Sequence, residues 1–409
     1  MSDKTILFVH KNFPAQFGHI ARELCEKHGY RSHFVCELPP AQFGRIERVQ
    51  YQVKGGATQQ SHYCSRSFEN ATWHSHAVFE TLAARPDIQP DLIVGHSGFG
   101  STLFLRELYD CPIINYFEYF YHTRNSDMDF RPEFAGPRLS LLRARARNAM
   151  LLLDLHNCDA GYSPTQWQAG RFPPEFRARL NVLFDGIDTD VWQPVSAPVR
   201  RVAGREIPEG YKVVTYVSRG FESMRGFDIF MQAAKQISTR RDDVIFVVVG
   251  EDRVCYGGDL NFTNGQTFKD WVLSQDSYDE ERFWFVGRLP PPELAELFSL
   301  SDAHIYLTVP FVLSWSLMNA LACGATVIAS DTEPVAEMIQ DGHNGLLVDF
   351  FDVDGFAERT CDVLAHPDQF THLSANGTAL VAENYSLDVM FPRLKSFFES
   401  VMNGSGGGC

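Results

Sequence analysis

The sequence lacks long apolar runs and paired cysteines. No window reaches the ~18 apolar residues of a membrane-spanning helix, and the start, MSDK followed by ILFV, lacks the charged and then apolar regions of a secretion signal. The nine cysteines are odd in number, scattered, and without a CxxC pair, which is typical of reduced thiols in a cytosol. We therefore expect a cytoplasmic protein with reduced cysteines.

Positive charge is also scarce. The chain has 36 lysines and arginines against 51 aspartates and glutamates, a formal net charge of −15. Each contact with a nucleic-acid phosphate calls for a cation, and an acidic surface repels polyanions. We therefore expect no nucleic-acid partner, although a local basic patch is compatible with this composition.

What is present is typical of an α/β protein. Hydrophobic residues are 44% and charged residues 21% of the 409 residues, and this length predicts two domains of roughly 200 residues each. Short apolar segments alternate with amphipathic helical patterns, which predicts doubly wound parallel sheets. The predicted strands are 6–9, 32–36, 91–94, 112–115, 160–162 and 181–184, then 212–217, 244–249, 282–286, 304–307 and 326–329.

The domain boundaries follow from a break in this alternation. Residues 194–210, PVSAPVRRVAGREIPEG, contain three prolines and two glycines without an apolar period, so they are predicted to be a linker. We therefore expect one Rossmann-like domain over 1–193 and a second over 211–384. A helix over 385–403 is expected to cross back to the first domain, and 404–409, GSGGGC, to be a flexible tail.

The stretch from Ser301 to Asp349 is predicted to form a ligand crevice. A strand at 304–307 leads through a loop into a helix at 315–322, and Gly324 ends that helix because it can take a left-handed conformation. A loop that feeds a helix N-terminus at the carboxyl edge of a parallel sheet offers free N–H groups to a phosphorylated ligand.

Several motifs occur in the order of a known family. They are FDGIDTDVWQP, SRGFESMRGFDIF, VVVGED, FVGRLPPPELAELFSLSDAHIYLT, LACGATVIASD and AEMIQDGHNGLLV. The chain thereby resembles the retaining glycosyltransferases of family 4, which have the GT-B fold of two Rossmann-like domains facing a cleft. The resemblance implies transfer of a sugar from a UDP- or GDP-sugar to an acceptor hydroxyl, with retention of configuration and without a cofactor or metal. The acceptor class stays open among glycans, lipid-linked molecules and small molecules.

Arg219 and Arg225 are the candidate diphosphate ligands. Arg219 follows the strand at 212–217, and Arg225 precedes Gly226 at the start of a helix, so both could reach one anion with forked guanidinium groups. The resemblance assigns them the stabilisation of the departing nucleotide, although Arg replaces the family's Lys and the spacing is one residue longer. The alternative is a pair of solvated surface arginines.

The predicted donor-binding region departs from the family pattern at two positions, and the Ser314 and Ser316 hydroxyls are the available substitutes. In register with LACG, the two family glutamates are replaced by Phe311 and Asn319. Asn319 can still accept a ribose hydroxyl, whereas Phe311 cannot bind a sugar in this way. The expected donor-side residues are Gly18, Arg288, Leu289, Ser314, Ser316 and Asn319.

Two residues of the first half complete the predicted site. His96 follows the strand DLIV in GHSGFGST, and the resemblance makes it a catalytic contact to the donor sugar; a structural histidine is the alternative. Glu118, among the aromatics of NYFEYFYH, could orient a sugar or acceptor hydroxyl, or be an acid at the edge of the core. Gly18 could equally mark an ordinary helix start.

The arginine-rich helix over 138–153, RLSLLRARARNAMLLL in sequence, allows two interpretations. It could dock on a membrane surface or an anionic acceptor, which would place the protein peripherally at the inner membrane face. It could also pack on the first sheet with its arginines reaching solvent.

A second function is compatible with the loss of both glutamates. The chain could be a GT-B scaffold that binds or regulates an active glycosyltransferase. Retention of His96 and both arginines argues against a pure scaffold. An epimerase or phosphorylase of the same fold is a third, weaker hypothesis.

Overall fold

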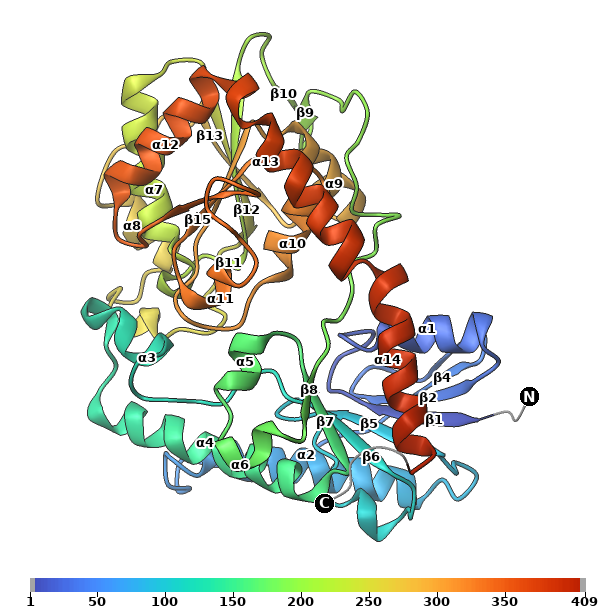
Figure 1. Cartoon of the computed structure of the whole chain (residues 1–409). Helices are drawn as coiled ribbons and strands as arrows, with labels where there is room; N and C mark the ends of the chain where they lie inside the picture. The colour runs from blue at the N-terminus through green and yellow to red at the C-terminus, as the bar shows by residue number, and fades with distance from the viewer. Residues whose placement is uncertain (1–3, 405–409) are drawn as a thin grey trace. The chain divides into compact units, whose positions relative to one another are not determined.

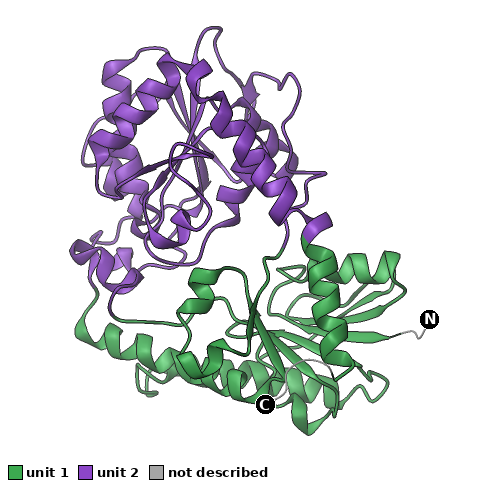
Figure 2. Ribbon diagram, in the orientation of Figure 1, with its two compact units in different colours: residues 1–123, 136–185, 390–409 green, residues 124–135, 186–389 purple. Residues whose placement is uncertain are grey.

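The computed structural model describes residues 4–404 and divides into two compact units. Unit 1 comprises the residues up to Thr123, Gly136–Asp185 and the residues from Met390 onward, whereas unit 2 comprises Arg124–Ala135 and Gly186–Val389 (Figure 2). The compact units differ from the predicted domains because 124–135 and 186–193 belong to unit 2.

Unit 1 is built on an eight-stranded sheet in the order β3-β4-β2-β1-β5-β6-β7-β8. Neighbouring strands are parallel, except that β3 is antiparallel to β4. The strands are β1 (Thr5–Val9), β2 (Arg31–Cys36), β3 (Ala41–Phe43), β4 (Ile46–Gln50), β5 (Leu92–His96), β6 (Ile113–Tyr116), β7 (Ala160–Ser163) and β8 (Leu180–Val182) (Figure 1).

Helices cover both faces of this sheet. Ile6 and Phe8 of β1 belong to one apolar core, and Leu7 and Val9 to another, because alternate side chains of a strand point to opposite faces. The helical segments of unit 1 are α1 (Gly18–Lys27), α2 (Arg66–Ala83), η1 (Leu105–Glu107), α4 (Arg138–Asn157), α5 (Gln166–Gly170) and α6 (Pro174–Arg177).

The last helix, α14 (Leu387–Met402), joins unit 1 from Met390 onward. Its Leu394 and Phe398 are buried in the same core as Ile6 and Phe8, and Tyr30 donates a hydrogen bond to Glu399 at 2.9 Å. The predicted return of this helix to the first domain is confirmed.

Unit 2 contains a six-stranded sheet in the order β13-β12-β11-β14-β15-β16, in which all neighbouring strands are parallel. The chain builds outward from β11 on one side and then on the other, which is the doubly wound Rossmann order. The strands are β11 (Lys212–Gly220), β12 (Val244–Glu251), β13 (Phe283–Gly287), β14 (Ala303–Tyr306), β15 (Val327–Ser330) and β16 (Leu346–Val348).

The helical segments of unit 2 cover its sheet (Figure 1). Apolar residues of α7 such as Phe230 and Ile237 have no exposed surface, so the helix pattern after Gly226 is confirmed. The segments are η3 (Ser223–Arg225), α7 (Phe227–Arg240), η4 (Asp259–Asn261), α8 (Phe268–Leu273), α9 (Pro291–Leu300), α10 (Trp315–Ala322), α11 (Glu333–Ala336), α12 (Val353–Ala365), α13 (Pro367–Leu380) and η5 (Val381–Tyr385).

Residues 124–135 fold against unit 2 although unit 1 flanks them in sequence. They form α3 (Asp127–Phe130) and η2 (Pro132–Phe134). The buried guanidinium of Arg131 binds both carboxylate oxygens of Asp228 at 2.8 and 2.7 Å, and the ring of Phe134 packs edge-on against Phe268. This segment has little apolar periodicity, so tertiary contacts determine its place.

The predicted linker over 194–210 is not structureless. It contains a short hairpin of β9 (Arg201–Val202) and β10 (Arg205–Glu206), whose turn residues Ala203 and Gly204 both have positive φ, as such two-residue turns require. The predicted flexible tail lies outside the described residues beyond Gly404. A helix with the length and apolarity of a membrane crossing does not occur among the described residues.

Candidate functional site

The strand order of unit 2 reverses between β11 and β14, and such a reversal opens a crevice at the carboxyl ends of the strands. A cavity lies at this point. None of its lining residues is acidic; they are Val217, Ser218, Arg219, Arg225, Tyr256, Tyr306, Leu307, Ser314 and Ser316. The structure thus brings together both predicted arginines and both predicted serines, at the end of β11 and the start of α10.

Arg225 is buried without a carboxylate partner. Its Nη1 donates to Thr308 Oγ1 at 2.6 Å and to the carbonyl of Val312 at 3.2 Å, and no ion pair involving it occurs among the described residues 4–404. Burial opposes its charge, but neighbouring tyrosine and glutamate oxygens raise the pKa of Arg225 above its ordinary value. No carboxylate in the described part of the chain contacts the guanidinium directly, so its charge is available to an anion.

The backbone before α7 fixes this arginine. Gly226 has φ of +61°, and a Cβ there would lie 2.7 Å from Leu307 Cβ. Any other side chain would be strained and would collide with the strand exit. The turn therefore needs glycine, which the SMRGF sequence supplies.

Tyr256 is near both arginines. Its ring lies 5.3 Å from the Arg225 guanidinium, and its hydroxyl raises the pKa of the exposed Arg219. The buried carboxylate of Glu222 accepts the N–H groups of Cys255, Tyr256 and Gly257 at 3.0, 2.8 and 3.1 Å. Glu222 therefore holds the loop that presents Tyr256.

The start of α10 supplies the remaining polar groups. Ser314 caps the helix by accepting the N–H of Ser316, the two hydroxyls are 2.9 Å apart, and the Tyr306 hydroxyl accepts the N–H of Ser314. The cavity measures about 20 Å³, which suffices for about one water molecule. A phosphate is larger than this cavity, so it can enter only if the exposed side chain of Arg219 moves outward.

Phe311 lies beside the arginine cavity, whereas Asn319 lies outside its lining. The buried ring of Phe311 lies 5.8 Å from the Arg225 guanidinium and 5.4 Å from the Tyr256 ring, so an aromatic ring stands near the cation where the family resemblance predicts an acid. Asn319 lies one turn after Ser316 on α10 but does not line the cavity.

Arg288 and Leu289 follow β13 and are not gathered at the arginine cavity. Arg288 is exposed. Leu289 lines a different cavity, formed with the β9–β10 hairpin and α9. Their predicted donor-binding role receives no support from the position of the cavity.

The sheet of unit 1 also reverses, between β1 and β5. His10 follows β1 and His96 ends β5, and their rings meet edge to face with centroids 5.1 Å apart. Phe99 stacks on His10 at 5.9 Å and contacts His96 at 5.1 Å. His96 has no exposed surface, so a ligand reaches it only if a neighbour moves.

Burial makes both histidines neutral. It lowers the pKa of His10 to about 4 and the pKa of His96 well below its ordinary value, and repulsion from a protonated His10 lowers the pKa of His96 further. The Nδ1 atom of His96 lies 3.0 Å from the carbonyl of Ser97 and must carry the proton, because a carbonyl only accepts. The Nε2 lone pair therefore faces the Gln16 amide at 3.4 Å.

The loop after His96 is held by a buried carboxylate of α4. Asp154 accepts hydrogen bonds from Ser97 at 2.7 Å and Ser101 at 2.8 Å. Burial raises the pKa of Asp154 to about 6, and the two serines reduce that shift. The GHSGFGS loop is thus fixed from beneath.

Glu118 and Gly18 have clear local settings. A carboxylate oxygen of Glu118 lies 3.9 Å from His96 Nε2, beyond hydrogen-bond distance, so the structure brings these two predicted residues together without a direct bond. A Cβ on Gly18 would lie 2.3 Å from Pro14 Cβ. Close packing at the start of α1 therefore explains this glycine.

Sequence reasoning missed His10, Glu222, Tyr256 and Asp154. His10 could have been found, because ILFVH and DLIVGH end alike and their strands pair with Val9 opposite Gly95. Glu222 reaches a loop more than thirty residues away, and no local pattern signals such a contact. No group of three or more His, Cys, Asp or Glu suited to a metal ion occurs within residues 4–404.

Comparison with known proteins gives matches over most of the chain. The model of the glycosyl transferase family 4 group matches residues 28–192, and that of glycosyl transferases group 1 matches residues 202–379. D-inositol 3-phosphate glycosyltransferase of Mycolicibacterium smegmatis is 26% identical over 246 residues, which are 59% of this chain and 49% of that protein. Spore coat protein SA of Bacillus subtilis is 22% identical over 55% of this chain and 60% of that protein.

Solved structures share the fold over nearly the full length. A sucrose-phosphate synthase from Thermosynechococcus elongatus superimposes with a TM-score of 0.75 at 18% identity, over 98% of this chain and 100% of that one. Anabaena HepE in complex with UDP and glucose gives 0.66 at 14% identity, over 97% and 100%. The matches to the curated relatives span about half of their length. With two doubly wound units and both family models matched in order, the chain belongs to glycosyltransferase family 4, with the GT-B fold.

Proposed function

We propose that the protein transfers a sugar from a nucleoside diphosphate sugar to an acceptor hydroxyl, and that the arginine cavity of unit 2 binds the diphosphate. One observation carries this proposal: two arginines and five hydroxyl groups, but no carboxylate, line a cavity at the sheet reversal. Such a lining favours an anion, since forked guanidinium groups bind phosphate oxygens in pairs.

The same groups account for catalysis. Negative charge develops on the departing diphosphate, and cations already in place stabilise it without reorganisation. Arg225 is fixed by Thr308 and Val312, whereas Arg219 is exposed and closes on the ligand. As in the family that the sequence resembles, transfer proceeds with retention and without a metal, and the acceptor proton passes to the leaving phosphate oxygen.

We assign a supporting role to the histidine pair of unit 1. The neutral His96 offers a lone pair at Nε2 that accepts a hydroxyl proton in a hydrogen bond once Gln16 moves aside. The carboxylate of Glu118, 3.9 Å from that atom, can accept a second hydrogen bond from a hydroxyl group. Both suit a sugar or an acceptor, and neither is needed as a strong base.

The donor nucleotide to test first is uridine diphosphate, because the fold matches a protein whose structure contains UDP and glucose. The acceptor remains a glycan, a lipid-linked molecule or a small molecule. Arg288 and Asn319 stay as proposed donor contacts outside the cavity lining, to be tested after the arginines.

Phe311 favours a second candidate function, that of a binding or regulatory relative of an active enzyme. Its ring stands near the Arg225 guanidinium and cannot accept a sugar hydroxyl. In this alternative the cavity still binds a nucleotide, but no sugar is transferred.

Calorimetric titration separates these functions. Wild-type protein is titrated with UDP, GDP, ADP and the matching monophosphates, and each nucleotide sugar is then assayed for hydrolysis and transfer. The transferase proposal expects one diphosphate to bind clearly more tightly than its monophosphate, with turnover of its sugar. Binding without turnover over broad acceptors supports the regulatory relative, and no binding at millimolar concentration overturns both.

A further inference from the structure

The outer face of α4 in unit 1 is unlike the rest of this acidic chain. Between Arg138 and Asn157 the sequence contains four arginines and a single acid, Asp154, and that acid is fully buried. The chain as a whole has a net charge of −15. This helix is therefore locally basic in an acidic chain.

Two of these arginines are free. Arg143 donates to Tyr63 and Ser67, and Arg147 donates to Tyr121 at 2.6 Å, so both belong to the packing of unit 1. Arg138 and Arg145 are exposed, and neither makes a hydrogen bond or ion pair within the part of the chain that the structure describes.

Leucines share the same outer face. Exposed positions recur along α4 at the 3.6-residue helical period. Leu142 is 55% exposed, and three further leucines are also exposed, although a single exposed leucine would mean little. The outer leucines are Leu139, Leu142, Leu152 and Leu153.

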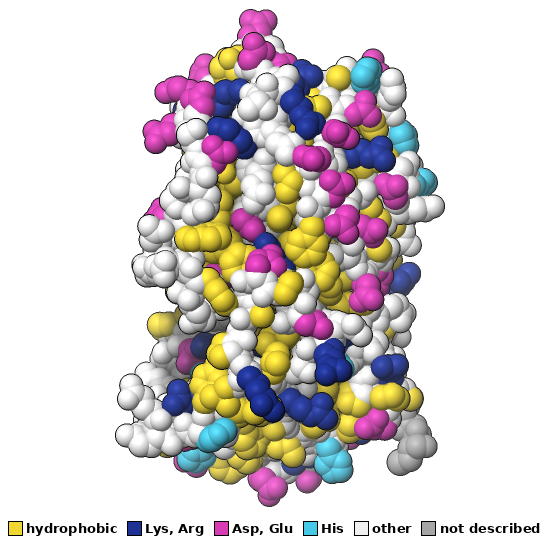
Figure 3. Space-filling model, turned by 90° about the vertical axis from the view of Figure 1, so that its left-hand side faces the viewer, with side chains coloured by type: hydrophobic (Ala, Val, Ile, Leu, Met, Phe, Trp, Pro, Cys, Tyr) yellow, Lys and Arg dark blue, Asp and Glu magenta, His cyan; other side chains and the backbone are white. Residues whose placement is uncertain are grey.

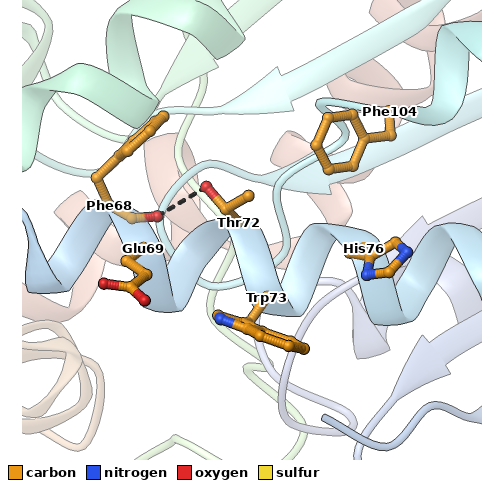
Figure 4. Close-up of a pocket in the computed structure, with 6 residues that line it drawn as sticks. All are labelled: Phe68, Glu69, Thr72, Trp73, His76 and Phe104. Atoms are coloured by element: carbon orange, nitrogen blue, oxygen red, sulfur yellow. Dashed lines mark hydrogen bonds between the residues drawn. The ribbon is translucent and has the colours of Figure 1, made fainter. Parts of the chain in front are cut away.

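Helix α2, which packs against α4, lines an apolar groove (Figure 4). Phe68, Thr72 and His76 follow one another at intervals of four residues, and Phe104 lies opposite them. The Thr72 hydroxyl donates to the carbonyl of Phe68, so it adds no free polar group. The groove measures about 410 Å³ and is completed by Glu69 and the exposed Trp73.

The two helices form one layer. Arg143 of α4 donates hydrogen bonds to Tyr63, which precedes α2, and to Ser67 in its first turn. Val78 and Leu151 share a core beneath the two helices. The lower part of Figure 3 shows apolar and basic side chains side by side on the surface of unit 1. The acids of α2 are few: Glu69 lies at the groove, and Glu80 is paired with His76 at 3.5 Å.

We propose that this α2–α4 layer docks on a membrane that contains anionic lipids. Free arginines meet the lipid phosphates, leucines and Trp73 enter the region of the acyl chains, and the groove adds apolar surface. Exposed basic and apolar side chains on one helix are typical of a helix that lies in the membrane interface. Each arginine near an anionic bilayer strengthens binding by about fivefold. The proposal deepens the proposed function, because it favours an acceptor carried by a membrane lipid.

Co-sedimentation with vesicles tests the proposal. Full-length protein is mixed, without nucleotide, with vesicles of phosphatidylcholine alone or with phosphatidylglycerol added. We expect binding only to the anionic vesicles, a loss of at least tenfold in Leu142→Glu, and a loss of about 25-fold in the double variant Arg138→Gln and Arg145→Gln. Val199→Glu is the matched control, since Val199 is 59% exposed in unit 2, and it should bind like wild type.

Several results would overturn the proposal. They are an absence of binding to anionic vesicles, equal binding to neutral ones, or an equal loss in Val199→Glu. Circular dichroism and UDP titration of each variant check that it is folded. Because UDP binding is measured without vesicles, wild-type protein that binds UDP but not anionic vesicles refutes only the membrane contact. Wild-type protein that binds anionic vesicles but no nucleoside diphosphate refutes only the transferase proposal.

Discussion

The two sheet reversals of this protein have the same topology and opposite chemistry. In unit 1 the strand ends carry His10 and His96, whose pKa values are lowered by burial. In unit 2 they carry Arg219 and Arg225, which stay charged. A buried histidine loses its proton and becomes neutral, whereas an arginine keeps its charge. The two units therefore place neutral rings and fixed cations at equivalent points of their sheets, and only the cations suit the diphosphate that we propose as ligand.

A second contrast lies within unit 2. Arg131 and Arg225 are both buried, but only Arg131 has a carboxylate partner, Asp228. We regard Arg131 as structural and Arg225 as a ligand-binding residue. The following predictions test these contrasts, from the largest expected effect to the smallest.

Arg131→Ala should lower the free energy of unfolding by about 3–5 kcal/mol, because it leaves the Asp228 carboxylate buried and unpaired. Urea unfolding measures this change. Arg359→Ala is the control, since Arg359 is exposed on α12, and it should stay within about 0.5 kcal/mol of wild type. A similar small change in both variants would show that the Arg131 pair contributes little.

His10→Phe should reduce acid sensitivity. The unfolded chain binds a proton at His10 near pH 6.5, whereas the folded chain does so only near pH 4. Wild type therefore loses stability as pH falls through this window, by about 3 kcal/mol from this residue. The loss should be smaller by that amount in His10→Phe and unchanged in His156→Ala. Parallel pH profiles for wild type and His10→Phe would refute a neutral, buried imidazole.

Asp259→Asn should remove a loss of stability that occurs as pH rises, the opposite of the dependence expected for His10. Burial raises the pKa of Asp259 to about 6, an effect that Ser223 reduces and Glu222 increases. The folded chain thus holds this proton more tightly than the unfolded chain, so wild type loses stability as pH rises from about 4 to 6. The variant should be more stable by about 1–3 kcal/mol at pH 8 and no more stable at pH 4. A gain that does not vary with pH would exclude titration of Asp259 as its cause.

Phe311→Glu should weaken UDP binding by about fivefold. The new carboxylate would attract Arg225 by about 1 kcal/mol, and the diphosphate would have to replace this interaction. Phe311→Leu is the control for the loss of the ring. If the Glu variant instead binds a UDP-sugar more tightly than UDP, Phe311 occupies a sugar-binding position.

Much of the fold could be predicted, because buried parallel strands are continuous apolar runs such as VIFVVVG of β12. Strands β3 and β4, on one side of the unit 1 sheet, were missed, since only two of their eight residues are buried. Segment 124–135 could not be assigned to unit 2 from its own residues. Its position depends on Asp228 and Phe268, which lie about a hundred residues or more away.

In the candidate site, too, residues marked by the local sequence were predicted and residues placed by distant contacts were not. Arg219 and Arg225 were predicted because a strand exit and a helix start mark them in the local sequence. Tyr256 and Glu222 were not, because their contacts join two loops that only the folded sheet brings together. Gly18 was predicted for its lack of a Cβ, but the structure shows that Pro14 is what the missing atom would meet.

The most direct test is titration of Arg225→Ala with UDP, or with whichever diphosphate binds wild type best. The account predicts affinity weaker by about 1.5–3 kcal/mol, roughly 10- to 150-fold, with Arg359→Ala unchanged. Stability should change far less than in Arg131→Ala, because no carboxylate is left unpaired. Affinity within twofold of wild type, in a folded Arg225→Ala protein, would contradict the assignment of the diphosphate to this cavity.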